Sequence, residues 1–271
     1  INLIRDLDIH IVPLGLTISG ETYQDGVDLQ SGAFYDLLKQ TPITPTTSAP
    51  APESFLQTFT RLADVADSVI CLTLSSNLSS THQSAEAAAQ TAKDTLPGFP
   101  ITVVDTHTAA AAEGLIVLEA ARAAQQKATA DQILELIRSI SLRVRLIGYL
   151  DTLYYLRKSG RIPLLASWMG TLLNIKPMLE LANGRINLLE RPRTKRRAIE
   201  RLLSNIESHA KGHPIHAIIV HAASPRDAED LRILVQQHFT CSELHVTEFT
   251  PIIGAHIGPG LVGCAFYVDM Y

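Results

Sequence analysis

The first half of the chain alternates short apolar runs with segments of helical character, and this alternation limits the fold more than any other feature. Residues 69–74 and 101–104 are apolar and rich in β-branched side chains, as buried strands are. Alanine-rich segments follow them, at residues 82–93 and 109–126. Strand, loop and helix repeated in this order is typical of a parallel sheet covered by helices on both faces. In such sheets, ligands bind at the carboxyl ends of the strands.

The second half has a different pattern, which indicates a mixed α/β unit. Further strands are predicted at residues 9–14, 146–149, 186–190, 215–221, 244–249 and 263–269, and further helices at 31–40, 54–63, 131–143, 193–209 and 226–238. With a boundary near Arg143, we expect an N-terminal parallel-sheet three-layer α/β domain over residues 1–143 and a C-terminal mixed-sheet α/β domain over residues 144–271. Residues 1–7 look like the tail of a helix, so we expect the first strand of the N-terminal sheet to be missing.

Composition excludes several classes of protein. Hydrophobic residues make up 46% of the 271 and charged residues 18%, which rules out a disordered chain. The net charge of −4 rules out a globally basic nucleic-acid binder. The three cysteines are far apart, and the ten histidines show no metal-ligand spacing, so we predict neither disulfides nor a metal site. No signal peptide is visible, which predicts a cytoplasmic protein.

Residues 249–268 contain no Asp, Glu, Lys or Arg. Twenty such residues could cross a bilayer core of about 30 Å as a helix. Four glycines and two prolines in this segment break a helix more than they build one. We therefore predict a buried loop between apolar strands, beside an apolar pocket, and no integral membrane span.

Basic residues gather in one region, with eleven Lys or Arg and three Glu between Arg157 and Arg201. The densest part is residues 191–197, with the sequence RPRTKRR. This region is either a solvated helix face or a surface that docks an acidic partner or phosphates. Few aromatic residues lie between the charges, which argues against base stacking with nucleic acid.

Two polar segments could bind an anion. In residues 45–52, PTTSAPAP, prolines hold the backbone extended and present the hydroxyls of Thr47 and Ser48, unless the segment only caps the next helix. Residues 75–81, SSNLSST, hold more hydroxyl and amide groups than one helix cap needs. They precede a predicted helix, whose amino end has unpaired N–H groups and the positive end of the dipole. The segment lacks the phosphate-loop pattern of nucleotide-binding proteins.

His256 lies in the uncharged segment, within the sequence AHIGPG. It is either a core histidine or part of a site, where the neighbouring glycines would let the backbone approach a ligand closely. With Ser79 it could form a nucleophile–base pair, but G-x-S-x-G is absent and nothing picks out a third member. A hydrolase of lipid esters or thioesters therefore stays open. The alternative is a site for an amphiphile with an anionic head.

Five motifs in this order resemble those of the DegV family, which includes the FakB fatty-acid-binding subunits of bacterial fatty acid kinases. The motifs are P-T-T-S-x-P-x-P at 45–52, S-S-x-L-S-x-T-x-x-S-A at 75–85, Y-L-R-K-S-G-R-I at 155–162, K-P-M-L at 176–179 and A-H-I-G-P-G-x-x-G at 255–263. The resemblance covers nearly the whole chain. The chain departs from the family pattern at Ser80 and Ser159, where glycine is usual, and at His82, where an aromatic residue is common.

The resemblance implies that one long-chain fatty acid, similar to palmitate or oleate, is buried between the two domains. Family members hold the carboxylate at positions that match Thr47, Ser79 and His256 here. A separate ATP-binding kinase subunit then phosphorylates the bound carboxylate to an acyl phosphate for phospholipid metabolism. The protein would be a carrier with no cofactor, no nucleic-acid partner and no catalytic residue of its own, and could contact a membrane surface transiently.

Two further groups of residues belong to this prediction. Additional pocket residues are expected at Ser48, Ser76, Asn77, Ser80, Ile257 and Gly258. The surface that docks the kinase is expected at Arg161, Arg191, Arg193, Lys195, Arg196 and Arg197. Hydroxyls and an imidazole would hold the carboxylate by hydrogen bonds without a fixed cation, and so leave it able to attack a phosphoryl donor.

Overall fold

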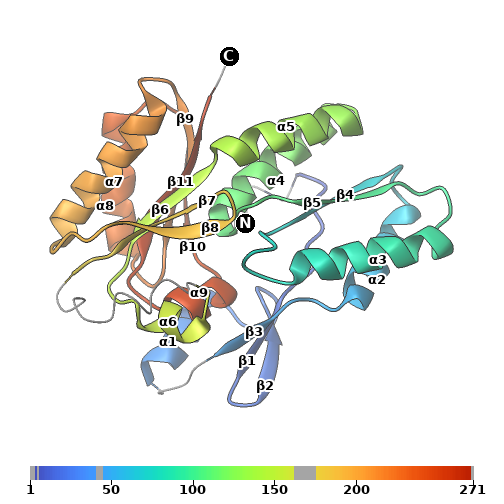
Figure 1. Cartoon of the computed structure of the whole chain (residues 1–271), viewed down its shortest axis with the longest axis horizontal. Coiled ribbons are helices and arrows are strands. Elements are labelled where there is room, and N and C mark those ends of the chain that lie inside the picture. The colour runs from blue at the N-terminus through green and yellow to red at the C-terminus, as the bar shows by residue number, and fades with distance from the viewer. Residues whose placement is uncertain (1–3, 5, 41–44, 162–174, 270–271) are drawn as a thin grey trace.

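A six-stranded mixed sheet and a two-stranded parallel sheet lie on either side of two central helices, α4 and α5 (Figure 1). The computed structural model describes residue 4 and residues 6–40, 45–161 and 175–269. Its strands are β1 Gly15–Ile18, β2 Glu21–Gln24, β3 Thr46–Ser48, β4 Val69–Thr73, β5 Ile101–Asp105, β6 Arg145–Tyr149, β7 Met178–Ala182, β8 Arg185–Glu190, β9 Ile215–His221, β10 Cys241–Glu248 and β11 Val262–Val268. Its helices are α1 Ser31–Gln40, α2 Pro52–Ala63, α3 Thr81–Thr95, α4 Ala110–Gln125, α5 Ala130–Arg143, α6 Tyr154–Ser159, α7 Lys195–Ala210, α8 Pro225–His238 and α9 Pro251–Ile257.

The parallel pair β4 and β5 forms the middle of three layers, as the alternation predicts. Val69 and Cys71 point to one face, where they pack with phenylalanines of α2 and alanines of α3. Ile70 and Leu72 point to the other face and join the core that contains α4 and α5. Strand residues that alternate between two apolar layers explain why these runs are apolar throughout.

The larger sheet has the strand order β10-β9-β11-β6-β7-β8. β9 and β10 are parallel, whereas β11, β6, β7 and β8 pair antiparallel with their neighbours, which confirms the mixed sheet. Leu202 of α7 and Leu231 of α8 are buried on one face. On the other face, Ile218 of β9 packs in the same core as Ile116 of α4. This core joins residues from both halves of the chain, and the division at Arg143, the last residue of α5, stays a prediction.

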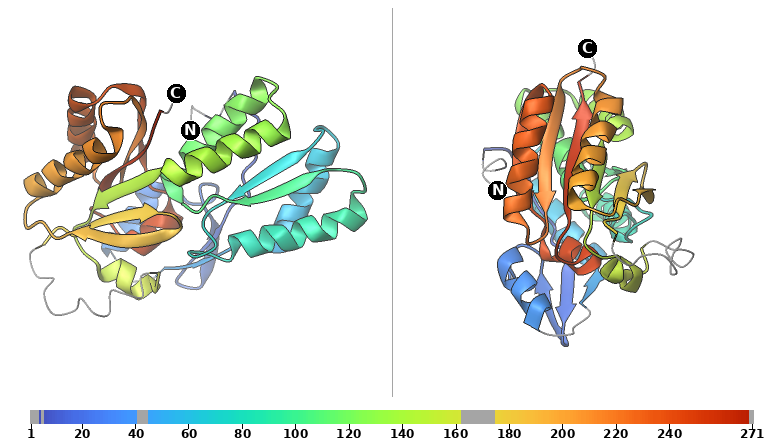
Figure 2. Two further views of the ribbon diagram at one scale, coloured as in Figure 1. Left: turned by 45° about the horizontal axis from the view of Figure 1, so that its top comes forward. Right: turned by 90° about the vertical axis from the view of Figure 1, so that its left-hand side faces the viewer.

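A small antiparallel sheet, in the order β2-β1-β3, differs from the predicted start of the chain. Residues 9–14 are irregular, and the strand begins only at Gly15, just after Pro13 and Leu14. Proline has no N–H to donate to a sheet, which accounts for the later start. In the register of this sheet, Leu16 of β1 lies opposite Thr47 of β3. Figure 2 shows the sheet in blue directly below α9 in red.

The uncharged segment is the main correction to the sequence prediction. Instead of a loop, residues 251–257 form helix α9. Pro251 occupies the first turn, where its missing N–H costs nothing. Gly254 faces the rings of Phe34 and Tyr35 so closely that a Cβ would lie 2.6 Å from Phe34 Cε1. Pro251 therefore begins a short helix, Gly254 lets it pack closely on the two rings, and Gly258 ends it.

None of the described helices is long and apolar enough to cross a membrane. Residues 1–3 and 5 lie outside the described part of the chain, so the helix tail predicted for residues 1–7 is not tested.

Candidate functional site

A cavity of about 520 Å³ lies between the small sheet, the start of α3, helix α9 and one face of β6, β7 and β8. This volume falls within the range of about 300–1,000 Å³ that small-molecule sites span. Its apolar lining includes Leu14, Leu74, Leu78, Leu146, Leu179, Leu181, Ile186, Phe249 and Leu261. Its polar lining residues are Thr47, Ser48, Ser79, Ser80, Ser84, Arg161 and His256. A long apolar wall with a few polar groups is suited to an amphiphile.

Thr47 and His256 meet in this lining. The hydroxyl of Thr47, from β3, and Nε2 of His256, from α9, share a hydrogen bond of 3.0 Å across 209 residues of sequence. Nδ1 of His256 is buried and has no hydrogen-bond partner among the described residues. Buried polar atoms almost always have a partner, so an unpaired imidazole nitrogen beside a cavity indicates a ligand position.

The imidazole of His256 is neutral near pH 7. Burial, together with the smaller effect of the positive charge of Arg161, lowers its pKa to about 4. A neutral imidazole and a hydroxyl carry two polar hydrogens between them, and their mutual bond uses one. Whichever tautomer is present, one hydrogen remains for an acceptor. The pair is therefore a hydrogen-bond donor without being a cation.

Ser79 and Ser80 also line the cavity, at the start of α3. Ser79 Oγ lies 2.8 Å from Thr81 Oγ1 and accepts the Thr81 N–H at 3.3 Å. Ser79 thus occupies the amino end of α3, where N–H groups favour negative charge. The described hydrogen bonds of the Ser79 side chain are to Thr81, and none is to His256.

Three of the predicted pocket residues are absent from the lining, whereas Ser48, Ser80 and Ile257 are in it. The N–H of Ser76 donates to Asp105 at 3.1 Å, and the N–H of Asn77 donates to Ser75 Oγ at 3.2 Å. These bonds hold the backbone of Ser76 and Asn77 in the turn that follows β4. Gly258 ends α9 with a φ of +68° and packs against the ring of Tyr155.

Arg161 is exposed, as a docking residue must be, and also lies at the cavity. It lines the cavity and lies within electrostatic reach of His256, although it was assigned to the docking surface. Its Nη1 donates to the Ser159 carbonyl at 2.6 Å, just beyond α6. The cavity lining therefore includes a cationic side chain in addition to the expected hydroxyls and imidazole. This position belongs to the Y-L-R-K-S-G-R-I motif of the family resemblance, but its charge alone decided its assignment to the docking surface.

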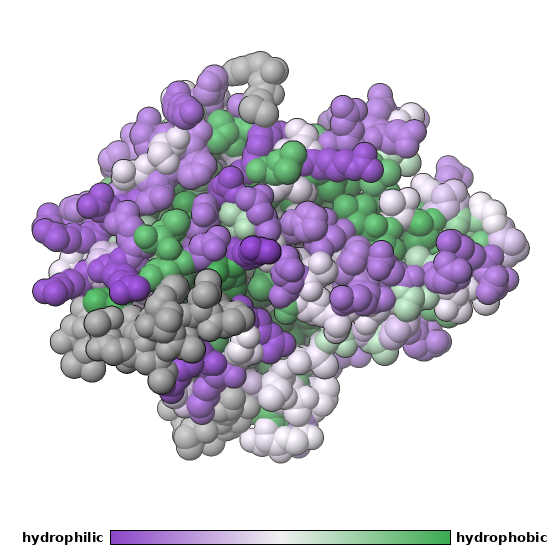
Figure 3. Space-filling view, in the orientation of Figure 1, coloured by the Kyte–Doolittle hydropathy of each residue, from purple (hydrophilic) through white to green (hydrophobic). Residues whose placement is uncertain are grey.

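The other predicted docking residues lie together before and within the first turn of α7. Arg191, Arg193, Arg196 and Arg197 are exposed. Lys195 pairs with Asp227 of α8, and Arg196 pairs with Glu200 at 3.2 Å. Figure 3 shows a largely hydrophilic surface over α7 and α8. The geometry fits both a solvated face and a docking surface, so the docking role stays a prediction.

The apolar wall from β6, β7 and β8 was not predicted. Leu146 lies opposite Leu181, which lies opposite Ile186, so these side chains share one face of the sheet. The signal is present in the sequence MLELANGRINLLE, where apolar residues alternate on either side of an Asn-Gly turn. This pattern predicts a hairpin with one apolar face.

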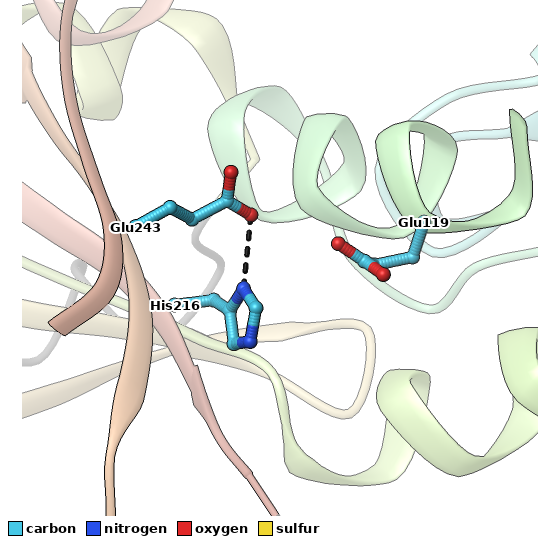
Figure 4. Close-up of side chains that lie close together, drawn as sticks. All are labelled: Glu119, His216 and Glu243. Carbon is cyan, nitrogen blue, oxygen red and sulfur yellow. Dashed lines mark hydrogen bonds and ion pairs between the residues drawn. The ribbon is translucent and has the colours of Figure 1, made fainter. Parts of the chain in front are cut away.

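A second cluster, of Glu119, His216 and Glu243, has metal-ligand types close together (Figure 4). Arg122 donates two hydrogen bonds to Glu243, at 3.0 and 2.8 Å. Both nitrogens of His216 contact carboxylates, Glu243 at 2.9 Å and Asp269 at 3.0 Å. These contacts raise the pKa of His216 despite its burial. The guanidinium of Arg122 supplies the positive charge that a metal ion would bring to these carboxylates. The cluster is therefore an ion-pair network that ties α4 to β9 and β10.

Comparison with known proteins decides the family. The model of a family described as uncharacterised proteins, DegV family, matches residues 1–269. The chain belongs to the DegV family. A DegV domain-containing protein of Streptomyces coelicolor is 36% identical over 258 residues, which cover 94% of this chain and 89% of that protein.

Solved structures of DegV proteins have the same fold. A protein of Thermus thermophilus, described by its fatty acid binding, is 31% identical and superposes with a TM-score of 0.91, over 99% of this chain and 95% of that one. DegV of Bacillus subtilis, described as a fatty acid binding protein, is 27% identical with a TM-score of 0.86, over 99% and 94% of the two chains. The mixed α/β architecture is thus that of the DegV family.

Proposed function

We propose that this protein binds one long-chain fatty acid in the cavity, with the carboxylate at Thr47, Ser79 and His256, and presents it to a separate ATP-dependent kinase subunit. The observation that carries the binding proposal is the unpartnered Nδ1 of His256 beside a cavity with an apolar wall. The fatty acid binding described for the Thermus and Bacillus relatives supports it.

The acyl chain supplies the larger part of the binding energy. Each buried CH₂ contributes about 0.8 kcal/mol, so a chain of palmitate length gains about 10 kcal/mol before the costs of association. A carboxylate buried without partners would cancel much of this gain. The Thr47–His256 pair provides a donor for it, and the charge of Arg161 offsets its negative charge.

Presentation to a kinase requires the carboxylate to lie near a surface that another protein can reach. Arg161 meets this requirement, because it is exposed and also lines the cavity. The exposed arginines at residues 191–197 extend the positive charge and would steer an acidic partner. In this role the protein is a carrier and no enzyme by itself. Its cytoplasmic location and transient membrane contact stay predictions.

The geometry does not favour the alternative, a Ser/His hydrolase. In a catalytic triad the base bonds the serine hydroxyl and an acidic residue orients the base. Here Nε2 of His256 contacts Thr47, while Ser79 contacts Thr81. The other nitrogen of His256 contacts no carboxylate among the described residues.

The test is mass spectrometry of lipid extracted from the purified protein, followed by delipidation and reloading with palmitate. We expect one fatty acid per chain before delipidation and again after reloading. The proposal would be overturned if the extract contained no fatty acid and the delipidated protein took up no palmitate. Hydrolysis of a palmitoyl ester by the protein alone, lost in Ser79→Ala, would favour the hydrolase instead.

A further inference from the structure

Asp25 lies outside the cavity lining but contacts the helix that carries His256. It follows β2, and its Oδ1 accepts a hydrogen bond from the N–H of Ile252 at 3.2 Å, across 227 residues of sequence. The side chain of Thr250 also favours its charged form, although burial raises the pKa of Asp25 overall. The carboxylate is half-buried, and a group of this kind needs partners such as these.

The bond from Ile252 to Asp25 replaces the cap that α9 lacks. Thr250 is the N-cap residue, but its side chain makes no capping bond to its own helix. Pro251 has no N–H, so the N–H of Ile252 is the first that the helix offers. An unsatisfied N–H at the start of a helix is costly, and an acidic side chain there also interacts favourably with the helix dipole. Asp25 therefore caps α9 from a distant segment.

The capped residue is one helical turn from His256. Ile252 and His256 are four residues apart, so they lie on the same face of α9, and both line the cavity. A shift or fraying at Ile252 would move the imidazole with it.

Both ends of α9 are tied to the same small sheet. Asp25 follows β2 and donates its own N–H to the Leu14 carbonyl, 3.0 Å away, just before β1. Thr47 lies on β3 and bonds His256 at the other end of the helix. β2, β1 and β3 are hydrogen-bonded neighbours. Asp25 and Thr47 thus belong to one unit, which fixes α9 at two points.

We propose that Asp25 is a positioning residue, which holds α9 so that the imidazole of His256 stays in hydrogen-bond contact with Thr47 and faces the cavity. Its importance for carboxylate binding rests on the proposed function. The geometry of the Thr47–His256 pair can be measured without any ligand.

The chain offers a matched control for Asp25. Asp28 lies in the same segment and also accepts a backbone hydrogen bond, from the N–H of Gln24 at 2.8 Å, but this bond stays within its own turn. Asp25→Ala and Asp28→Ala therefore remove the same kind of group and bond, and only the first removes a contact with α9. Asp25→Asn keeps an acceptor oxygen and serves as the conservative variant.

The first measurement is the NMR spectrum of the His256 imidazole in the delipidated protein, with circular dichroism to check the fold. Asp25→Ala should change the imidazole shifts, Asp28→Ala should leave them unchanged, and Asp25→Asn should restore most of the wild-type spectrum. Unchanged shifts in a folded Asp25→Ala protein would overturn the proposal. This result does not depend on fatty acid binding, so it stands even if the proposed function fails.

The second measurement is palmitate affinity in a double-mutant cycle with His256→Ala. Asp25→Ala alone should weaken binding about three- to thirtyfold, the span that loss of a helix cap gives. In the His256→Ala background, the same change should have little further effect, because Asp25 acts through the imidazole. An equal loss in both backgrounds would show that Asp25 only stabilises the fold, and would contradict the proposal.

Discussion

At the scale of single residues, the site depends on a polar pair that is neutral. Thr47 and His256 come from segments 209 residues apart and meet at 3.0 Å. Burial keeps the imidazole uncharged, with Arg161 adding to the effect. A neutral donor loses less hydration energy on burial than an ammonium or guanidinium group would. This explains how hydrogen bonding to an anion can be combined with an apolar cavity.

The low pKa of His256 predicts an acid-sensitive fold. A histidine with a pKa of about 4 when folded and 6.5 when unfolded stabilises the fold above pH 6.5, and this contribution is lost as the pH falls toward 4. Between pH 7 and pH 5, delipidated wild type should lose about 2 kcal/mol more than His256→Gln does. Urea unfolding of both proteins at the two pH values measures this difference. Equal losses would show that His256 is not held in its neutral form.

Removing the hydroxyl of Thr47 should weaken carboxylate binding. Thr47→Val keeps the shape of the side chain, and loss of one donor at a buried charged acceptor costs about 1–3 kcal/mol, or about five- to 150-fold in affinity. Thr46→Val, on the exposed neighbour in the same strand, is the control and should bind as wild type does. Calorimetric titration with palmitate gives both constants. A wild-type affinity for Thr47→Val would place the carboxylate elsewhere.

At the scale of elements, α9 determines the geometry of the site. Asp25 caps its start, Gly254 lets it pack on the rings of α1, and Gly258 ends it against Tyr155. Contacts from three separate segments thus hold a helix of seven residues. An isolated helix of this length would not be stable in water, so its structure comes from these tertiary contacts.

Gly258→Ala should therefore displace α9. A Cβ at this position would overlap the Tyr155 ring, and the φ of +68° is strained for alanine. Gly26 has nearly the same φ, +70°, with no atom within 4 Å of such a Cβ, so Gly26→Ala measures the cost of an alanine at positive φ without a clash. Gly26→Ala should cost about 1 kcal/mol and Gly258→Ala at least about 2 kcal/mol more. Equal costs in chemical denaturation would contradict the packing described here.

The sequence was informative where local pattern decides the structure. Strand β9, residues 215–221, and helix α1, residues 31–40, have the predicted bounds, since apolar periodicity defines them. It failed at α9, because proline and glycine were counted as helix breakers, while the rings that accept Gly254 and the carboxylate of Asp25 lie more than 200 residues away. The family resemblance assigned Thr47 and His256 to one carboxylate site, whereas their direct hydrogen bond and the place of Arg161 required the fold.

At the scale of the whole molecule, lipid and partner would be recognised by different surfaces. The cavity lies between the small sheet and the β6–β8 face, whereas the exposed arginines at residues 191–197 precede and begin α7. Arg161 connects the cavity with the outer surface, because it lines the cavity and is also exposed. Separate surfaces allow loading and docking to be changed independently.

Charge reversal should separate the two functions. With Arg193, Arg196 and Arg197 changed to Glu, palmitate loading should equal wild type, because none of them lines the cavity. Acyl-phosphate formation with the ATP-binding kinase subunit of the same organism should fall at least about tenfold, since long-range attraction becomes repulsion. The control reverses Arg61, Lys93 and Arg138, three exposed residues on other helices, and changes the net charge equally. If turnover survives in the first variant, or falls equally in the control, this surface is only a solvated face.

The most direct test of the central claim is a crystal structure of the protein loaded with palmitate. The account predicts a carboxylate oxygen at about 2.7–3.2 Å from the Thr47 hydroxyl or from Nδ1 of His256, and an acyl chain against Leu146, Leu179 and Leu181. A palmitate bound in the opposite direction, with its methyl end at His256, would contradict the account. So would an empty cavity with the lipid bound outside it.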